Sequence, residues 1–105
     1  MDLDRAFAAL ADPTRRHIVT VLRSAPQDVG TLARPLPISR PAVSKHLAVL
    51  AAAGLVEVEK SGRRRLYRLH PEGFAEVRRW LDQVARTWDV ALERFRRHVE
   101  GDGEG

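Results

Sequence analysis

The segment spanning residues 38–54 constrains the fold more than any other part of the chain. Three apolar residues lie at i, i+4 and i+7, the spacing that puts side chains on one face of an α-helix: Val43, Leu47 and Leu50. Ser39 can cap the first turn, and Pro41 is tolerated within it. Gly54 can end the helix, because glycine adopts the left-handed conformation at little cost. The segment therefore predicts one helix with a single buried face.

The opposite face of this predicted helix carries cations and short polar groups but no acid: Arg40, Ser44, Lys45 and His46. The acid-free stretch extends from Val29 to Val56, and a second basic cluster follows at residues 60–65. Clustered positive charge is the electrostatic footprint of a protein that binds nucleic acid. On charge alone, a solvated basic surface is the alternative interpretation.

Three shorter helices are predicted before residue 38. The first covers residues 3–10, and the second begins at Pro13 after an Asp12 cap and runs to about residue 24. Three basic residues fall on or near the face of the second helix that points away from the core: Arg15, Arg16 and His17. Asp28 can cap a third helix, which Pro35 ends. A tight connection then leads into the helix at 38–54, which gives a helix-turn-helix pattern.

After Gly54 the apolar period changes from 3.6 to 2. Residues 55–60 and 66–70 alternate, which places Val56 and Val58 on one face of the first strand and Tyr67 and Leu69 on the inner face of the second. Ser61-Gly62 lies between the strands and provides the turn signal of a β-hairpin. The sequence thus predicts a two-stranded wing whose tip region carries three arginines: Arg63, Arg64 and Arg65.

The last third of the chain predicts one long helix over residues 71–99. Its apolar residues alternate in steps of three and four: Phe74, Val77, Leu81, Val84, Trp88, Ala91 and Phe95, widened by Trp80, Leu92 and Val99. Such a helix is roughly 43 Å long, more than a small winged domain can cover. We expect a second copy of the chain to cover the surplus face; the alternative is a helix that folds back on its own core. Residues 101–105 are expected to form a disordered tail.

Composition excludes several classes of protein. The chain of 105 residues suits one small domain, and the lack of cysteine excludes disulfides and thiolate metal sites. No apolar run approaches a membrane span and no signal peptide is evident, so we expect a soluble cytoplasmic protein. We find no nucleophile with a base at hand, no paired carboxylates and no glycine-rich phosphate loop, so an enzyme is not expected.

Four segments together resemble the ArsR-type winged helix-turn-helix transcriptional regulators: Asp12-Pro-Thr-Arg-Arg16, Ile38-Ser-Arg-Pro-Ala-Val-Ser-Lys-His-Leu47, Ala53-Gly-Leu-Val56 and Gly62-Arg-Arg-Arg-Leu-Tyr67. The resemblance extends from Leu3 to about Val99. It implies a mainly α fold of about five helices with a two-stranded wing, formed by residues 1–100 as one DNA-binding domain. It also implies a homodimer that binds a palindromic operator and represses transcription, with its own gene as one candidate target.

Specific residues follow from the resemblance. The recognition-helix positions correspond to Ser39, Arg40, Pro41, Ala42, Ser44, Lys45 and His46, and the wing positions to Arg63, Arg64 and Arg65. The resemblance implies dimerisation through the first and last helices, where the apolar candidates are Leu3, Phe7, Trp80, Leu81, Val84, Trp88, Leu92 and Phe95. The chain lacks both the cysteine pair and the Asp-x-His pattern of metal-sensing members. It therefore resembles the non-metal branch of the family. We expect no metal site and no cofactor, and the sequence does not indicate which inducer the protein would bind.

A recognition helix in the major groove can distinguish all four base pairs. Arg40 can present a fork to guanine O6 and N7, and Lys45 suits a phosphate contact, whereas Ser44 and His46 could bond base edges or phosphates. The wing arginines would meet phosphates or the adjacent minor groove. An alternative function is a winged-helix protein-interaction module that uses its basic face on an acidic partner.

Overall fold

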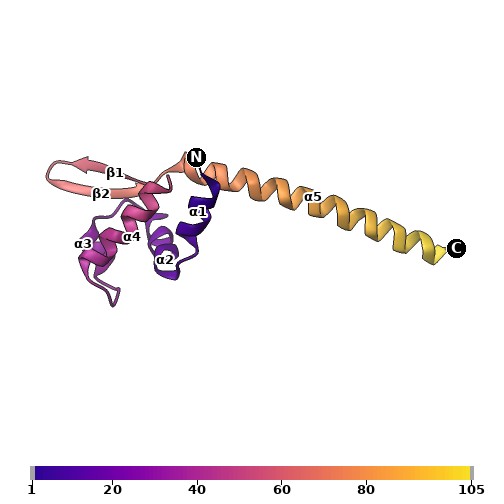
Figure 1. Cartoon of the computed structure of the whole chain (residues 1–105), viewed down its shortest axis with the longest axis horizontal. Helices are drawn as coiled ribbons and strands as arrows, with labels where there is room; N and C mark the ends of the chain where they lie inside the picture. Colours follow the sequence, from indigo (N-terminus) through magenta and orange to yellow (C-terminus); the bar gives the residue numbers. More distant parts are fainter. Residues whose placement is uncertain (1, 105) are drawn as a thin grey trace.

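The computed structural model describes residues 2–104, and side chains as far as residue 101. Five helices and two strands follow one another along the chain (Figure 1): α1 (Leu3–Leu10), α2 (Pro13–Leu22), α3 (Val29–Ala33), α4 (Arg40–Ala52), β1 (Val56–Ser61), β2 (Arg64–Leu69) and α5 (Pro71–Glu104). The predicted mainly α fold with one β-hairpin is confirmed, and α2 ends two residues earlier than predicted.

Side-chain caps fix where the first four helices begin. Asp2, Asp12, Asp28 and Ser39 each accept a hydrogen bond from a backbone N–H in the first turn of the helix that follows. The Asp12, Asp28 and Ser39 caps agree with the sequence prediction. Gly54, with φ of 77°, turns the chain after α4 as predicted.

The core lies between α1, α2, α4 and the base of the hairpin. The apolar stripe predicted for α4 is fully buried, and it packs with Ile18 of α2 and Leu55 before β1. Because Val43, Leu47 and Leu50 fix the inner face of α4, its polar face must point outward.

The hairpin is antiparallel and pairs Val56 with Leu69 at its base and Ser61 with Arg64 at its tip. Gly62 has φ of 62°, which suits the tight turn that it forms with Arg63. Val56 and Val58 were predicted to share one face of the first strand, and they differ in burial: Val56 is buried, but Val58 is 39% exposed. The reason is that the hairpin projects beyond the body of the domain, so that the core covers only its base (Figure 1).

Helix α5 leaves the body of the domain instead of folding back on it (Figure 1). Val77, 6% exposed, is the last buried residue among the described side chains, and the ring of Trp80 meets that of Phe7 on α1 at 5.3 Å in an edge-on arrangement. The molecule measures 72 × 27 × 23 Å, and its radius of gyration of 19.7 Å exceeds the value of about 13 Å expected for a compact domain of this length. The fold-back alternative is therefore wrong for this structure.

The far end of α5 also differs from the prediction. The helix was expected to end near Val99 and to give way to a disordered tail at 101–105, but its backbone stays helical to Glu104. Glycine lowers helix stability by about 1 kcal/mol per residue without preventing the helical hydrogen bonds, and no proline interrupts this segment. Gly105 and Met1 lie outside the described residues.

Candidate nucleic-acid interface

The outward face of α4 presents most of the predicted recognition residues. Five of them are exposed: Ser39, Arg40, Pro41, Ser44 and Lys45. Ala42 and His46 are half-buried. The Ser39 hydroxyl is occupied by the cap, since it accepts a hydrogen bond from the Ala42 N–H at 3.3 Å. The face therefore offers two cations, one serine hydroxyl and little bulk near the start of the helix.

Arg40 lies against α3, the first helix of the helix-turn-helix pair. Its guanidinium passes over Gly30, where the first carbon of any side chain would lie 3.3 Å from Nη2 of Arg40 and 3.7 Å from Oδ1 of Asp28. The absence of a side chain at Gly30 thus makes room for the arginine. Arg40 therefore lies close to the N-terminal end of α3 while it remains exposed.

The wing is tied to α3 by one ion pair. Arg64 donates to Asp28 at 3.1 Å, and the same carboxylate accepts from the Thr31 N–H at 2.7 Å to cap α3. Hydrogen bonds from Thr31, followed by the bond from Arg64, lower the pKa of Asp28 to about 2. Asp28 therefore brings Arg64 near Arg40, although the two arginines are distant in sequence. Arg63 and Arg65 lie exposed beside them on the hairpin.

A backbone bridge adds a second connection between the hairpin and the helices. Gln27 and Tyr67 exchange hydrogen bonds of 3.0 and 2.8 Å, which pairs the residue before Asp28 with the middle of β2. Sequence reasoning did not find this bridge, because a single paired residue has no period to recognise. The bridge and the Asp28–Arg64 pair together fix the wing relative to α3.

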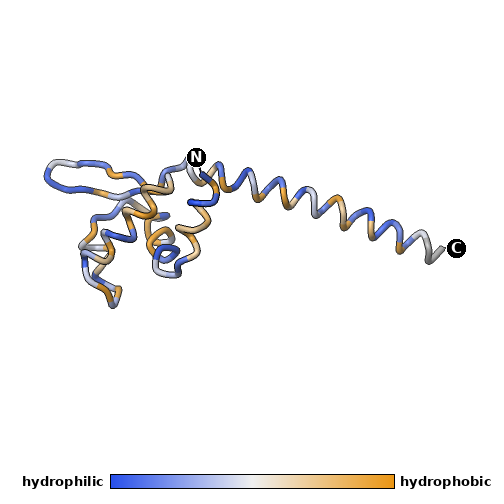
Figure 2. Tube along the Cα trace, in the orientation of Figure 1, coloured by the Kyte–Doolittle hydropathy of each residue, from blue (hydrophilic) through white to orange (hydrophobic). Residues whose placement is uncertain are grey.

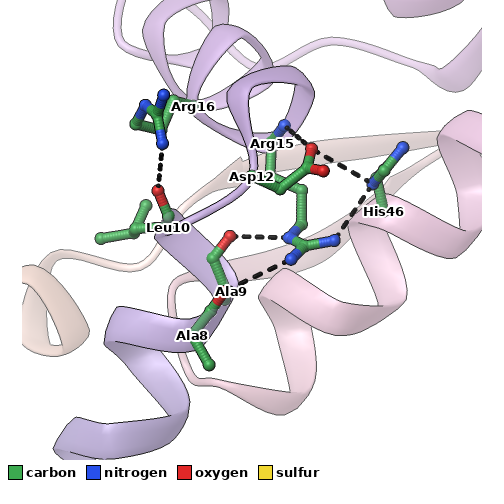
Figure 3. A network of polar contacts seen from close by, with 7 residues as sticks. All are labelled: Ala8, Ala9, Leu10, Asp12, Arg15, Arg16 and His46. Carbon is green, nitrogen blue, oxygen red and sulfur yellow. Dashed lines mark hydrogen bonds and ion pairs between the residues drawn. The ribbon is translucent and has the colours of Figure 1, made fainter.

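His46 is held from inside the domain. Its side chain is 23% exposed, and its Nδ1 lies 3.4 Å from Nη1 of Arg15 and 3.9 Å from Oδ2 of Asp12 (Figure 3). The hydrogen bond from the Arg15 N–H, with the nearby Arg15 charge adding to it, lowers the pKa of Asp12. Arg15 was expected on or near the outer face of α2, but it is half-buried between α1 and α4.

The apolar stripe of α5 is exposed along most of its length. Figure 2 shows hydrophobic and hydrophilic residues alternating along that helix. Six of the predicted dimerisation residues are exposed on α5: Trp80, Leu81, Val84, Trp88, Leu92 and Phe95. On α1, Phe7 is exposed and touches Trp80, whereas Leu3 is half-buried against the core. The structure thus brings α1 and the start of α5 together at one end of the stripe.

The described part of the chain contains no group of three or more residues that could hold a metal ion. Across the same residues, no helix combines the length and apolar character needed to cross a membrane.

Comparisons with known proteins agree with this geometry. Residues 10–59 match the family model of a helix-turn-helix domain. Over 101 residues the chain is 50% identical to the HTH-type transcriptional regulator Rv2034 of Mycobacterium tuberculosis, covering 96% of this chain and 92% of that protein. The structure of an ArsR-like transcriptional regulator from Rhodococcus sp. RHA1 is 42% identical, with a TM-score of 0.76 over 89% of this chain and 88% of that one.

The chain belongs to the ArsR family of transcriptional regulators. Another similar structure is the homodimeric winged helix-turn-helix DNA-binding domain Mb0332 from Mycobacterium bovis, 28% identical with a TM-score of 0.66, covering 80% of this chain and 78% of that one. The winged fold and the function of an ArsR-family DNA-binding regulator, as opposed to an enzyme, are thereby confirmed. The individual DNA-binding and dimerisation residues stay predictions.

Proposed function

We propose that this ArsR-family chain acts in the cytoplasm as a homodimeric repressor that binds a palindromic operator, with the promoter of its own gene as the first candidate target. One observation carries the proposal: the acid-free face of α4 and the arginine wing are both exposed, and Asp28 ties the wing to α3 close to Arg40. Repression is what the family resemblance implies for such a chain.

The proposed dimer rests on the exposed stripe of α5. From Val77, which is buried, to Val99, which is exposed, the stripe covers about 33 Å of helix. A continuous apolar surface of this kind marks an interaction site, and a helix that is apolar on one stripe pairs most simply with a copy of itself. The homodimeric Mycobacterium bovis domain supports this arrangement.

Two-fold symmetry would present one α4 to each half of the operator. The two helices would then enter major grooves one turn of DNA, or a small multiple of one turn, apart. Arg40 would read guanine through its fork, and Lys45 would contact a phosphate. Since Asp28 holds Arg64 in the free protein, Arg63 and Arg65 are the wing residues most available to phosphates.

The test is a mobility shift with the DNA upstream of the chain's own gene against a scrambled duplex, at several salt concentrations. A repressor should prefer the first duplex and lose affinity steeply as salt rises. Arg63→Ala and Arg65→Ala should each lower the salt slope by about 1 per protomer. Arg86→Ala is the matched control, because it removes an exposed arginine from α5, the helix that runs away from the wing (Figure 1).

Weak binding that is equal for both duplexes even at low salt would contradict the proposal. That result would favour a protein-interaction module whose basic face meets an acidic partner. If Arg86→Ala changes the salt slope as much as the wing variants do, the proposed phosphate contacts of the wing are contradicted, but the proposed repressor function is not.

A further inference from the structure

The guanidinium of Arg15 joins three helices at one point (Figure 3). From its position on α2, Arg15 donates to two carbonyl oxygens at the end of α1: Nε to Ala9 at 2.6 Å and Nη2 to Ala8 at 3.3 Å. Its remaining nitrogen, Nη1, lies 3.4 Å from Nδ1 of His46 on α4. One side chain thus connects the end of α1 to the recognition helix.

This contact constrains which ring nitrogen of His46 can carry the proton. A guanidinium has only donors, so Nδ1 can form a hydrogen bond with it only as an acceptor. A hydrogen bond from Arg15 thus requires an unprotonated Nδ1, which leaves the ring proton on Nε2. Asp12 does not compete for Nδ1 at hydrogen-bond distance, since its Oδ2 lies 3.9 Å away and accepts from the Arg15 N–H at 3.0 Å.

The other ring nitrogen of His46 points away from Arg15 and Asp12 (Figure 3). It belongs to a side chain that is partly exposed beside Ser44 and Lys45, which are both fully on the outer face of α4. With its proton on Nε2, this nitrogen offers a hydrogen-bond donor to the surface that would meet DNA. Acceptors in DNA include phosphate oxygens and the O6, N7 and O4 atoms of base edges.

We propose that Arg15 is a positioning residue for DNA binding: it fixes His46 in the Nε2–H tautomer, so that His46 presents a donor to DNA. The proposal rests on the proposed function for its DNA contact, but the link between the two side chains can be measured without DNA. Because Arg15 also holds the end of α1, which carries Phe7, it connects the proposed dimer contact to the recognition helix.

The first test observes the tautomer directly. Long-range proton–nitrogen correlation spectra of the imidazole rings would be recorded at about pH 8, where an ordinary histidine is neutral. His46→Gln identifies the His46 signals among the four histidines. We expect an unprotonated Nδ1 in the wild-type chain and a shift toward mixed tautomers in Arg15→Ala.

Arg16→Ala is the matched control. Arg16 also donates to a carbonyl at the end of α1, that of Leu10 at 2.9 Å, but no hydrogen bond to His46 is recorded for it among the described residues (Figure 3). Its removal should leave the His46 signals in place. A protonated Nδ1 in the wild-type chain, or equal shifts in both arginine variants, would overturn the inference.

The second test measures affinity for a duplex that the wild-type chain selects from a random-sequence library. His46→Gln, which keeps a donor near the outer position, should bind within about threefold of wild type, whereas His46→Asn should lose about five- to tenfold, the effect of one hydrogen bond. These two variants leave the Arg15 contacts to α1 intact, so they remain informative if Arg15→Ala folds poorly. Arg15→Ala should lose affinity in the wild-type background but not in the His46→Asn background.

Equal affinities of His46→Gln and His46→Asn, or an equal loss from Arg15→Ala in both backgrounds, would overturn the inference. If the wild-type chain selects no duplex, the proposed function fails, and the DNA role of His46 fails with it. If His46 carries its proton on Nδ1 and the wild-type chain still binds DNA specifically, this inference is overturned and the proposed function stands.

Discussion

Trp88→Ala should weaken the proposed dimer by about a thousandfold. Trp88 is 62% exposed in the single chain, and a tryptophan can bury roughly 250 Å², so a partner helix could cover about 150 Å² of it, worth about 4 kcal/mol at 25 cal/mol per Å². In the variant, the alanine and the residues next to it would still gain about half of this free energy through their own contacts with the partner helix. The loss is then about 2 kcal/mol per protomer and about 4 kcal/mol per dimer, or three powers of ten in the dissociation constant.

Sedimentation velocity over a range of protein concentrations measures this constant, and circular dichroism checks that helix content is unchanged. Trp88 lies beyond the last buried residue of α5, so the substitution should not disturb the core of the protomer. Val90→Ala is the matched control: Val90 is 52% exposed on the same helix, but two residues of helix rotate it by about 200°, away from the stripe.

An unchanged dissociation constant in Trp88→Ala would refute the assignment of this stripe to the dimer interface. So would an equal loss in Val90→Ala, because the effect would then come from general apolarity of α5 and not from one face. A wild-type chain that sediments as a monomer at micromolar concentration would refute the dimer itself.

Three further predictions concern the DNA-binding half of the domain. In a binding series on mutated operators, Arg40→Ala should flatten discrimination between variants. Arg64→Ala, which releases the wing from Asp28, should weaken binding to all variants alike, and the reverse pattern would contradict both roles. The pKa of Asp28 is about 2 in the folded chain, below its ordinary value of 3.8, so its carboxylate stabilises the fold above pH 3.8, and that contribution is lost as pH falls toward 2. The difference in thermal unfolding midpoint between the wild-type chain and Asp28→Asn should therefore shrink between pH 3.8 and about 2, and a difference that is constant over this window would contradict the shift. Treatment with a metal chelator should leave DNA affinity unchanged, because the chain has no cysteine and its described residues hold no cluster of metal ligands; a loss of affinity that added Zn²⁺ restores would show a metal site.

Local features of this chain were predictable from the sequence because each depends on residues a few positions apart. Ser39 and Asp28 cap helices whose first turns they directly precede, and Gly54 ends α4 at the position where a left-handed residue is needed. The buried stripe of α4 follows from helical spacing alone, and with it the outward direction of Arg40, Ser44 and Lys45. The helix-turn-helix pattern and the wing follow from the order of these elements.

Long-range contacts were not predictable, because they depend on how the elements pack against one another. Arg15 looked like a surface residue of α2, yet packing places it between the end of α1 and His46. The ion pair between Asp28 and Arg64 joins residues 36 positions apart, and no periodic pattern relates them. Val58 shows the same limit, because alternation gives the face of a strand but not how far the core extends beneath it.

The sequence by itself thus determined which helix faces outward with its cations and which stripe on the last helix is apolar, since both are matters of spacing along one element. Only the tertiary structure decided that α5 leaves the body of the domain with this stripe exposed. Only it decided that His46 is held from within by Arg15, because a side chain that spans three helices finds its partners only after those helices have packed.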